Sequence, residues 1–147
     1  SEQPARLRIP SLGVDAHVQD VGIAKSGRMA VPSNYTDVGW YRYGPAPGSV
    51  GSAVLDGHID NGFGLGGVFR RLGELRPGDE ILLETAGGEE LRFVVEEASV
   101  YEVADVPVDR IFNRNDAARL NLITCEGVWD GESRSYSERL VVYAVLR

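Results

Sequence analysis

Apolar and polar residues alternate along most of the chain with a period of two, rather than the 3.6 of a helix. This period is typical of β-strands that bury one face, and glycine, proline, serine and asparagine cluster between the runs as turn residues do. The aromatic run 38–41 is expected to pack against the core. The pattern predicts short strands at 7–10, 14–18, 29–31, 52–55, 80–85, 91–103, 118–124 and 136–146.

Helical periodicity is confined to two short stretches. Val68, Leu72 and Leu75 fall on one face, which predicts one short amphipathic helix over 68–75. Residues 107–112 predict a single helical turn. Many short, closely spaced strands with little helix favour an all-β fold, a closed or nearly closed β-barrel.

The composition is that of a soluble globular domain. Of the 147 residues, 43% are hydrophobic and 25% are charged, so we expect residues 1–147 to form a single domain with its own core. The net charge of −7, without any basic block, argues against nucleic acid and anionic membrane surfaces as partners. No apolar run approaches the ~20 residues that span a membrane.

The beginning of the chain looks like a cut end. It starts Ser1-Glu2-Gln3-Pro4, and the only methionine is Met29. We therefore expect that an upstream membrane anchor has been removed.

The single cysteine, Cys125, ends the apolar run 121–125 and precedes a polar loop. One cysteine cannot form an internal disulfide, and outside the cell a free thiol calls for an explanation. A lone cysteine is most often an inert core residue. A side chain at the end of a strand, however, is held rigidly and can still face a groove, as a nucleophile requires.

Two further residues are candidates for chemistry with Cys125. His58 follows Gly57 at the end of the run 52–55, whereas His17 lies within a strand pattern and is given no role. Arg139 begins the strand that follows the Cys125 loop, so antiparallel pairing would return it to Cys125. A thiol can act as a nucleophile, an imidazole can move protons and a guanidinium can hold an oxyanion.

Together these residues resemble the sortase family of bacterial surface transpeptidases. In that family the cysteine follows a Thr-Leu-x-Thr pattern, the histidine lies in a Gly-His motif and the arginine opens the next strand. Here 122–125 match the last four positions of the cysteine motif, with Asn121 in place of the first threonine, and 57–58 match the histidine motif. The resemblance also covers 7–14, 29–32, 47–48 and 69–79. It is greatest to the class E and class F branches, found in high-GC bacteria.

The resemblance implies a closed eight-stranded sortase-type barrel with one or two short helices, and a reaction in two stages. Cys125 would cleave an LPxTG-like sorting signal between Thr and Gly, giving a thioacyl enzyme that an amine of a cell-wall precursor or a pilin lysine then resolves. His58 would move the protons, and Arg139 would stabilise the oxyanion or hold the sorting peptide. Thr124 would contact the substrate or the arginine.

The same resemblance implies no cofactor and no required metal, and an extracytoplasmic enzyme anchored at the cell surface. Some family members bind calcium through acidic residues. The acidic residues Glu89, Glu90, Glu96 and Glu97 favour a solvated hairpin over such a site.

Two alternatives remain open from the residues alone. A cysteine hydrolase that passes the acyl group to water would use the same three residues. A non-enzymatic surface β-barrel that serves as a binding module would bury Cys125. L,D-transpeptidases are disfavoured because their histidine and cysteine lie close together in sequence.

Overall fold

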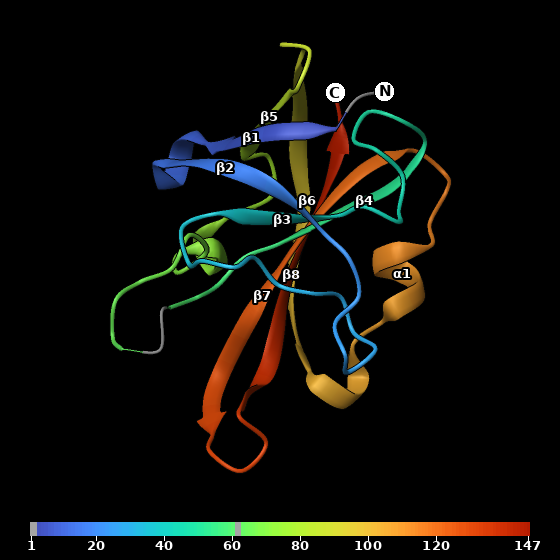
Figure 1. Cartoon of the computed structure of the whole chain (residues 1–147). Coiled ribbons are helices and arrows are strands. Elements are labelled where there is room, and N and C mark those ends of the chain that lie inside the picture. Colours follow the sequence, from blue (N-terminus) through green and yellow to red (C-terminus); the bar gives the residue numbers. More distant parts are fainter. Residues whose placement is uncertain (1–2, 61–62) are drawn as a thin grey trace.

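The computed structural model describes residues 3–60 and 63–147, and its strands close into a β-barrel (Figure 1). The order around the barrel is β1-β2-β3-β4-β7-β8-β6-β5. The β2–β3 and β4–β7 pairs are parallel and the other pairs are antiparallel. The predicted eight-stranded all-β barrel is therefore confirmed. The strands are β1 (Pro4–Ile9), β2 (Val14–Val21), β3 (Val38–Tyr41), β4 (Gly51–Asp56), β5 (Glu80–Thr85), β6 (Glu90–Glu102), β7 (Ala118–Asp130) and β8 (Ser135–Leu146).

The β7–β8 hairpin is longer than its hydrophobic pattern predicts. Pairing continues beyond Cys125 as far as Asp130, with a register shift between Glu126 and Trp129. Figure 1 shows this hairpin extending below the rest of the barrel. A pattern of one buried face cannot predict this part, because most of residues 127–134 are exposed.

The predicted strand at 29–31 is wrong. Only an isolated bridge between Ile23 and Met29 forms there, and the Ala30 N–H donates to the Gly22 carbonyl at 2.9 Å. The segment thus pairs with its own loop instead of joining the barrel, and Pro32 follows directly.

Helix is confined to short segments. The predicted helix at 68–75 is wrong: turns lead into a 3₁₀ helix, η2 (Leu72–Glu74), held by i→i−3 bonds, and Gly73 lies in its middle. The predicted turn at 107–112 is confirmed as α1 (Val108–Phe112), and the other 3₁₀ helices are η1 (Pro10–Leu12) and η3 (Val103–Asp105). No helix in the described part of the chain is long and apolar enough to cross a membrane.

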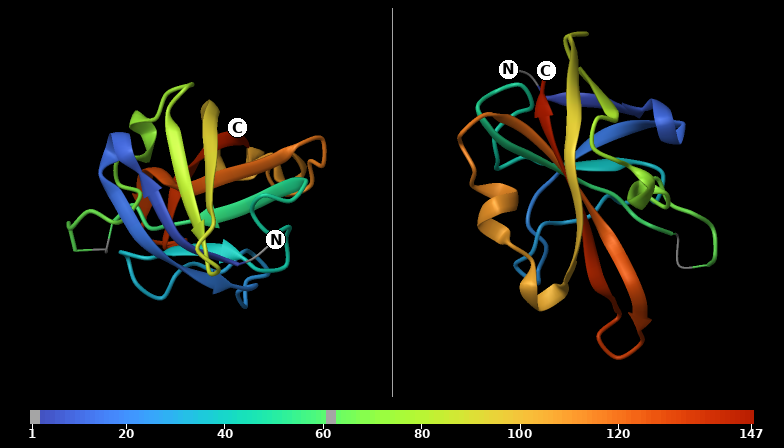
Figure 2. Two further views of the ribbon diagram at one scale, coloured as in Figure 1. Left: turned by 90° about the horizontal axis from the view of Figure 1, so that it is seen from above. Right: turned by 180° about the vertical axis from the view of Figure 1, so that it is seen from behind.

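Strands β4, β7 and β8 bury residues on both faces. Their inward residues, among them Leu55, Leu122 and Val142, belong to the barrel core. On the outer face Val54, Val141 and Tyr143 form a second apolar cluster with Ile111 of α1. The β6–β7 connection therefore packs against the outside of the barrel, beside β4 (Figure 2).

Candidate active site

A groove of about 1440 Å³ lies over the outer face of β4, β7 and β8. Its sides come from the β2–β3 connection, the β6–β7 connection and the base of the β7–β8 hairpin. The four residues predicted from sequence, His58, Thr124, Cys125 and Arg139, all line it. The fold thus brings together residues from three separate parts of the chain.

Cys125 is on β7 and directly faces Arg139 of β8 in the antiparallel register. The thiol is free and the residue is half-buried. Burial raises the pKa of this thiol, Arg139 lowers it, and the carboxyls of Asp56 and Asp60 raise it. The resting thiol is therefore mostly protonated, and a nucleophilic thiolate requires a base close by.

His58 comes two residues after β4, and its backbone is fixed by β7. The Thr124 hydroxyl donates to the Gly57 carbonyl at 2.8 Å, and the Gly57 N–H donates to the Ile123 carbonyl at 3.3 Å. A Cβ on Gly57 would lie 2.7 Å from side-chain atoms of Phe69, so the Gly-His motif needs its glycine for close packing.

The His58 ring is oriented by the β2–β3 connection. Its Nε2 lies 2.9 Å from the Pro32 carbonyl oxygen, which can only accept, so Nε2 carries the proton. In the neutral ring Nδ1 is then the basic nitrogen. The described residues include no hydrogen bond between the imidazole and Cys125.

Thr124 points into the barrel and is 3% exposed. Its bond to the Gly57 carbonyl supports a role in holding the His58 segment next to the cysteine. The resemblance to sortases implies a different contact for Thr124, with the substrate or with the arginine.

Arg139 is held by the base of its own hairpin. Nη1 donates to the carbonyls of Tyr136 at 3.0 Å and Glu138 at 2.9 Å, and Nη2 donates to the Ser135 hydroxyl at 2.9 Å. No carboxylate among the described residues forms an ion pair with this guanidinium. Its charge therefore remains available to an anion beside Cys125.

Sequence reasoning missed a contact that joins the histidine segment to β8. The Tyr136 hydroxyl donates to the Asp60 carboxylate, and this bond raises the pKa of Tyr136 to about 12. Trp129 packs edge-on against the Tyr136 ring at 5.3 Å. No local pattern relates Asp60 to Tyr136, because they lie far apart in sequence.

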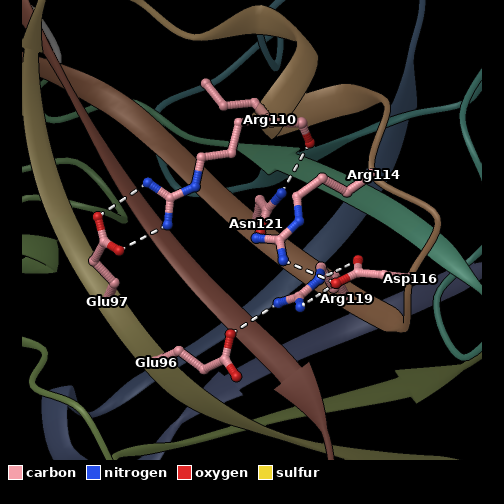
Figure 3. A network of polar contacts seen from close by, with 8 residues as sticks. Glu96, Glu97, Arg110, Arg114, Asp116, Arg119 and Asn121 are labelled. Carbon is pink, nitrogen blue, oxygen red and sulfur yellow. Dashed lines mark hydrogen bonds and ion pairs between the residues drawn. The ribbon is translucent and has the colours of Figure 1, made fainter.

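Arginines hold the β6–β7 connection, as Figure 3 shows. This connection forms one side of the groove. Arg110 donates to Glu97 at 2.7 and 3.1 Å and lies over the Tyr143 ring at 3.9 Å. Arg119 bridges Asp116 and Glu96.

The acidic residues Glu90, Glu96 and Glu97 of β6 are partly exposed and pair with arginines. The Arg110 guanidinium lowers the pKa of Glu97 to about 2. Glu96 and Glu97 thus pair with arginines, and Glu90 pairs with Arg8 at 2.5 Å. Among the described residues, no group of three His, Cys, Asp or Glu side chains is placed to hold a metal ion.

Comparisons with known proteins bear on the fold and the family. No curated protein matches the chain in sequence. Sortase A from Corynebacterium diphtheriae (a lid mutant) has a TM-score of 0.75 at 20% identity, covering 98% of this chain and 69% of that one. Sortase C-1 from Actinomyces oris has a TM-score of 0.73 at 23% identity, covering 97% of this chain and 71% of that one. Sortase A from Listeria monocytogenes has a TM-score of 0.74 at 20% identity, covering 99% of this chain and 87% of that one.

These likenesses show a common fold, and the family itself is shown by a sequence model. The model of the sortase domain matches residues 7–147, nearly the whole chain. The chain therefore belongs to the sortase family.

Proposed function

We propose that this protein is a cysteine transpeptidase that cleaves an LPxTG-like sorting signal between Thr and Gly and transfers the acyl group to an amine. The observation that carries the proposal is the pairing of Cys125 and Arg139 across β7 and β8, in the groove that His58 also lines. A nucleophile, a base and an oxyanion donor around one groove are the parts that acyl transfer needs.

In the first stage, His58 Nδ1 takes the proton of Cys125 and the thiolate attacks the carbonyl carbon of the threonine. The carbonyl oxygen becomes an oxyanion, which the Arg139 guanidinium stabilises. The carbon–nitrogen bond then breaks, and the imidazolium gives its proton to the departing glycine amine. The products are a thioacyl enzyme and a free amine.

In the second stage, an amine of a cell-wall precursor or a pilin lysine attacks the thioester. His58 takes the proton from the attacking nitrogen, the carbon–sulfur bond breaks, and the sulfur leaves as a thiolate that is reprotonated. The Pro32 carbonyl contributes by keeping the proton on Nε2, so that Nδ1 serves both stages. The sorting-signal protein and the amine acceptor at the bacterial cell surface are thus the proposed partners.

A peptide library built on LPxTG tests this proposal, incubated with the protein in the presence and absence of amines and read by mass spectrometry. Cleavage after threonine with an amine adduct is the expected result. Cleavage to the free acid only, with every amine tried, would favour the cysteine hydrolase. No cleavage, with a thiol that resists alkylation until the protein unfolds, would favour the binding module.

A further inference from the structure

The groove floor contains a carboxyl group that the proposed reaction does not use. Asp56 is the last residue of β4 and lines the groove with His58 and Cys125. The residue is 7% exposed, and its Oδ1 has no hydrogen-bond partner among the residues that the structure describes. A charged carboxylate in such a place is costly, and burial raises the pKa of this carboxyl well above its usual value.

The elements packed against Asp56 supply no positive charge. In the sheet it faces Gly39 of β3 and Ile123 of β7. A Cβ on Gly39 would lie 2.6 Å from Oδ1, 2.9 Å from Val21 and 3.2 Å from Pro32, so Oδ1 lies against Gly39 with the apolar side chains of Val21 and Pro32 close by. None of these four neighbours ionises. Only the backbone N–H of Asp56 itself favours the charged form, and burial outweighs it.

Asp56 is a diagonal neighbour of Cys125. Asp56 faces Ile123, and Cys125 lies two positions further along β7, on the same face of the sheet. The other ionisable groups around the thiol are His58, Asp60, Tyr136 and Arg139. A negative charge on Asp56 opposes formation of the thiolate, whereas a neutral carboxyl does not.

We propose that Asp56 is a positioning residue that acts through Cys125: its neutral carboxyl keeps the groove floor free of negative charge, and its ionisation suppresses the thiolate. Asp56 and Cys125 then titrate as a coupled pair of acids that resists carrying two negative charges. The inference rests on the proposed role of Cys125 as nucleophile, but it concerns the ionisation of the thiol and can be measured without substrate.

The experiment is the rate of Cys125 alkylation by iodoacetamide as a function of pH. Cys125 is the only thiol, so the signal is unambiguous. Asp56→Asn keeps the shape of the side chain and removes its charge, and we expect the midpoint of the profile to fall by about one pH unit. Where the wild-type Asp56 is ionised and the thiol is still mostly protonated, this corresponds to alkylation about tenfold faster. Where the wild-type carboxyl is neutral, the two rates should agree.

Two further variants separate charge from packing. Asp56→Ala also removes the charge and should shift the midpoint in the same direction as Asp56→Asn. Asp105→Asn removes an exposed carboxylate of η3 and should leave the midpoint unchanged. Equal midpoints in the wild type and both Asp56 variants would overturn the proposal, as would a shift of the same size in Asp105→Asn.

The wild-type protein provides a second measurement should the Asp56 variants fail to fold. With ¹³C-labelled aspartate, the Asp56 carboxyl should still be protonated at a pH where the exposed aspartates are ionised; ionisation together with them would overturn the proposal. A shifted alkylation midpoint in a protein that cleaves no LPxTG peptide would leave this inference standing and reject the proposed function.

Discussion

The two faces of β4, β7 and β8 carry different kinds of residues. The inward face contributes Leu55, Leu122 and Val142 to a continuous apolar core. The outward face has an apolar cluster at one end, and Asp56 and Cys125 in the groove at the other. Residues next to each other on β7 thus serve stability on one face and the proposed chemistry on the other, because successive side chains of a strand point to opposite sides.

The largest effect should come from the groove face. Cys125→Ala removes the proposed nucleophile and should abolish transpeptidation, while its melting temperature stays close to that of the parent, because the side chain is small and half-buried. Mass spectrometry of a sorting-signal peptide measures the loss of transpeptidation, and a thermal melt measures the melting temperature. Full activity in this variant would reject the nucleophile assignment.

His58→Asn should remove most of the activity, on the order of 10²–10⁴-fold, because general acid–base catalysis is lost. The pH profile of kcat/KM should lose its bell shape at the same time. His17→Asn is the matched control, since His17 is exposed on β2. Near-native rates with an intact bell in His58→Asn would assign proton transfer to another group.

Arg139→Ala should lower kcat/KM by on the order of 10²–10³, about 3–4 kcal/mol, the usual cost of removing an oxyanion donor. Arg139→Lys should recover only part of the loss, since an ammonium cannot reproduce the guanidinium fork. Arg134→Ala, in the loop of the same hairpin, should be far milder. If Arg134→Ala were the crippled enzyme instead, Arg139 would not be the oxyanion donor.

A substitution on the inward face should change the stability of the fold. Leu122→Ala should lower the free energy of unfolding by about 2–5 kcal/mol, since Leu122 is fully buried in the barrel core. Ile123→Ala, one residue further along β7 and on the groove face, should cost clearly less. Urea unfolding of both variants tests this, and equal losses would mean that the two faces do not differ in stability.

The smallest expected effect is that of Asp56→Asn on stability. Burial raises the pKa of the folded carboxyl above that of the unfolded chain, so the folded state binds the proton more tightly. Rising pH between these two pKa values therefore destabilises the wild type and not the variant. We expect the variant to melt about 2–4 °C higher than the parent at neutral pH, and no gain below the unfolded pKa. A gain of the same size at both pH values would point to packing.

The fold class and the main candidates for catalysis could be predicted without coordinates. A period of two identifies most strands, and the predicted run 80–85 coincides with β5. The cysteine and histidine motifs identify Cys125 and His58, and the order of the last two strands places Arg139 opposite the cysteine. These are features of local pattern and of a simple hairpin.

Other features depended on contacts that no local pattern contains. The segment 68–75 has helical periodicity. The N–H groups of its first two residues, however, bond to the carbonyls of Tyr35 and His58, and the segment forms turns that lead into the 3₁₀ helix η2. Likewise, the run 29–31 has a strand pattern but pairs with its own loop.

The sequence by itself determined which residues are apolar on each strand, and hence the barrel and the strands β7 and β8 that contain Cys125 and Arg139. Only the tertiary structure decided the bond of His58 to the Pro32 carbonyl, the contact between Asp60 and Tyr136, and the burial of Asp56. The physical reason is the separation in sequence over which each kind of interaction acts. Hydrophobic period and turn chemistry act between near neighbours, whereas these contacts form only when the closed barrel brings distant segments of the chain together.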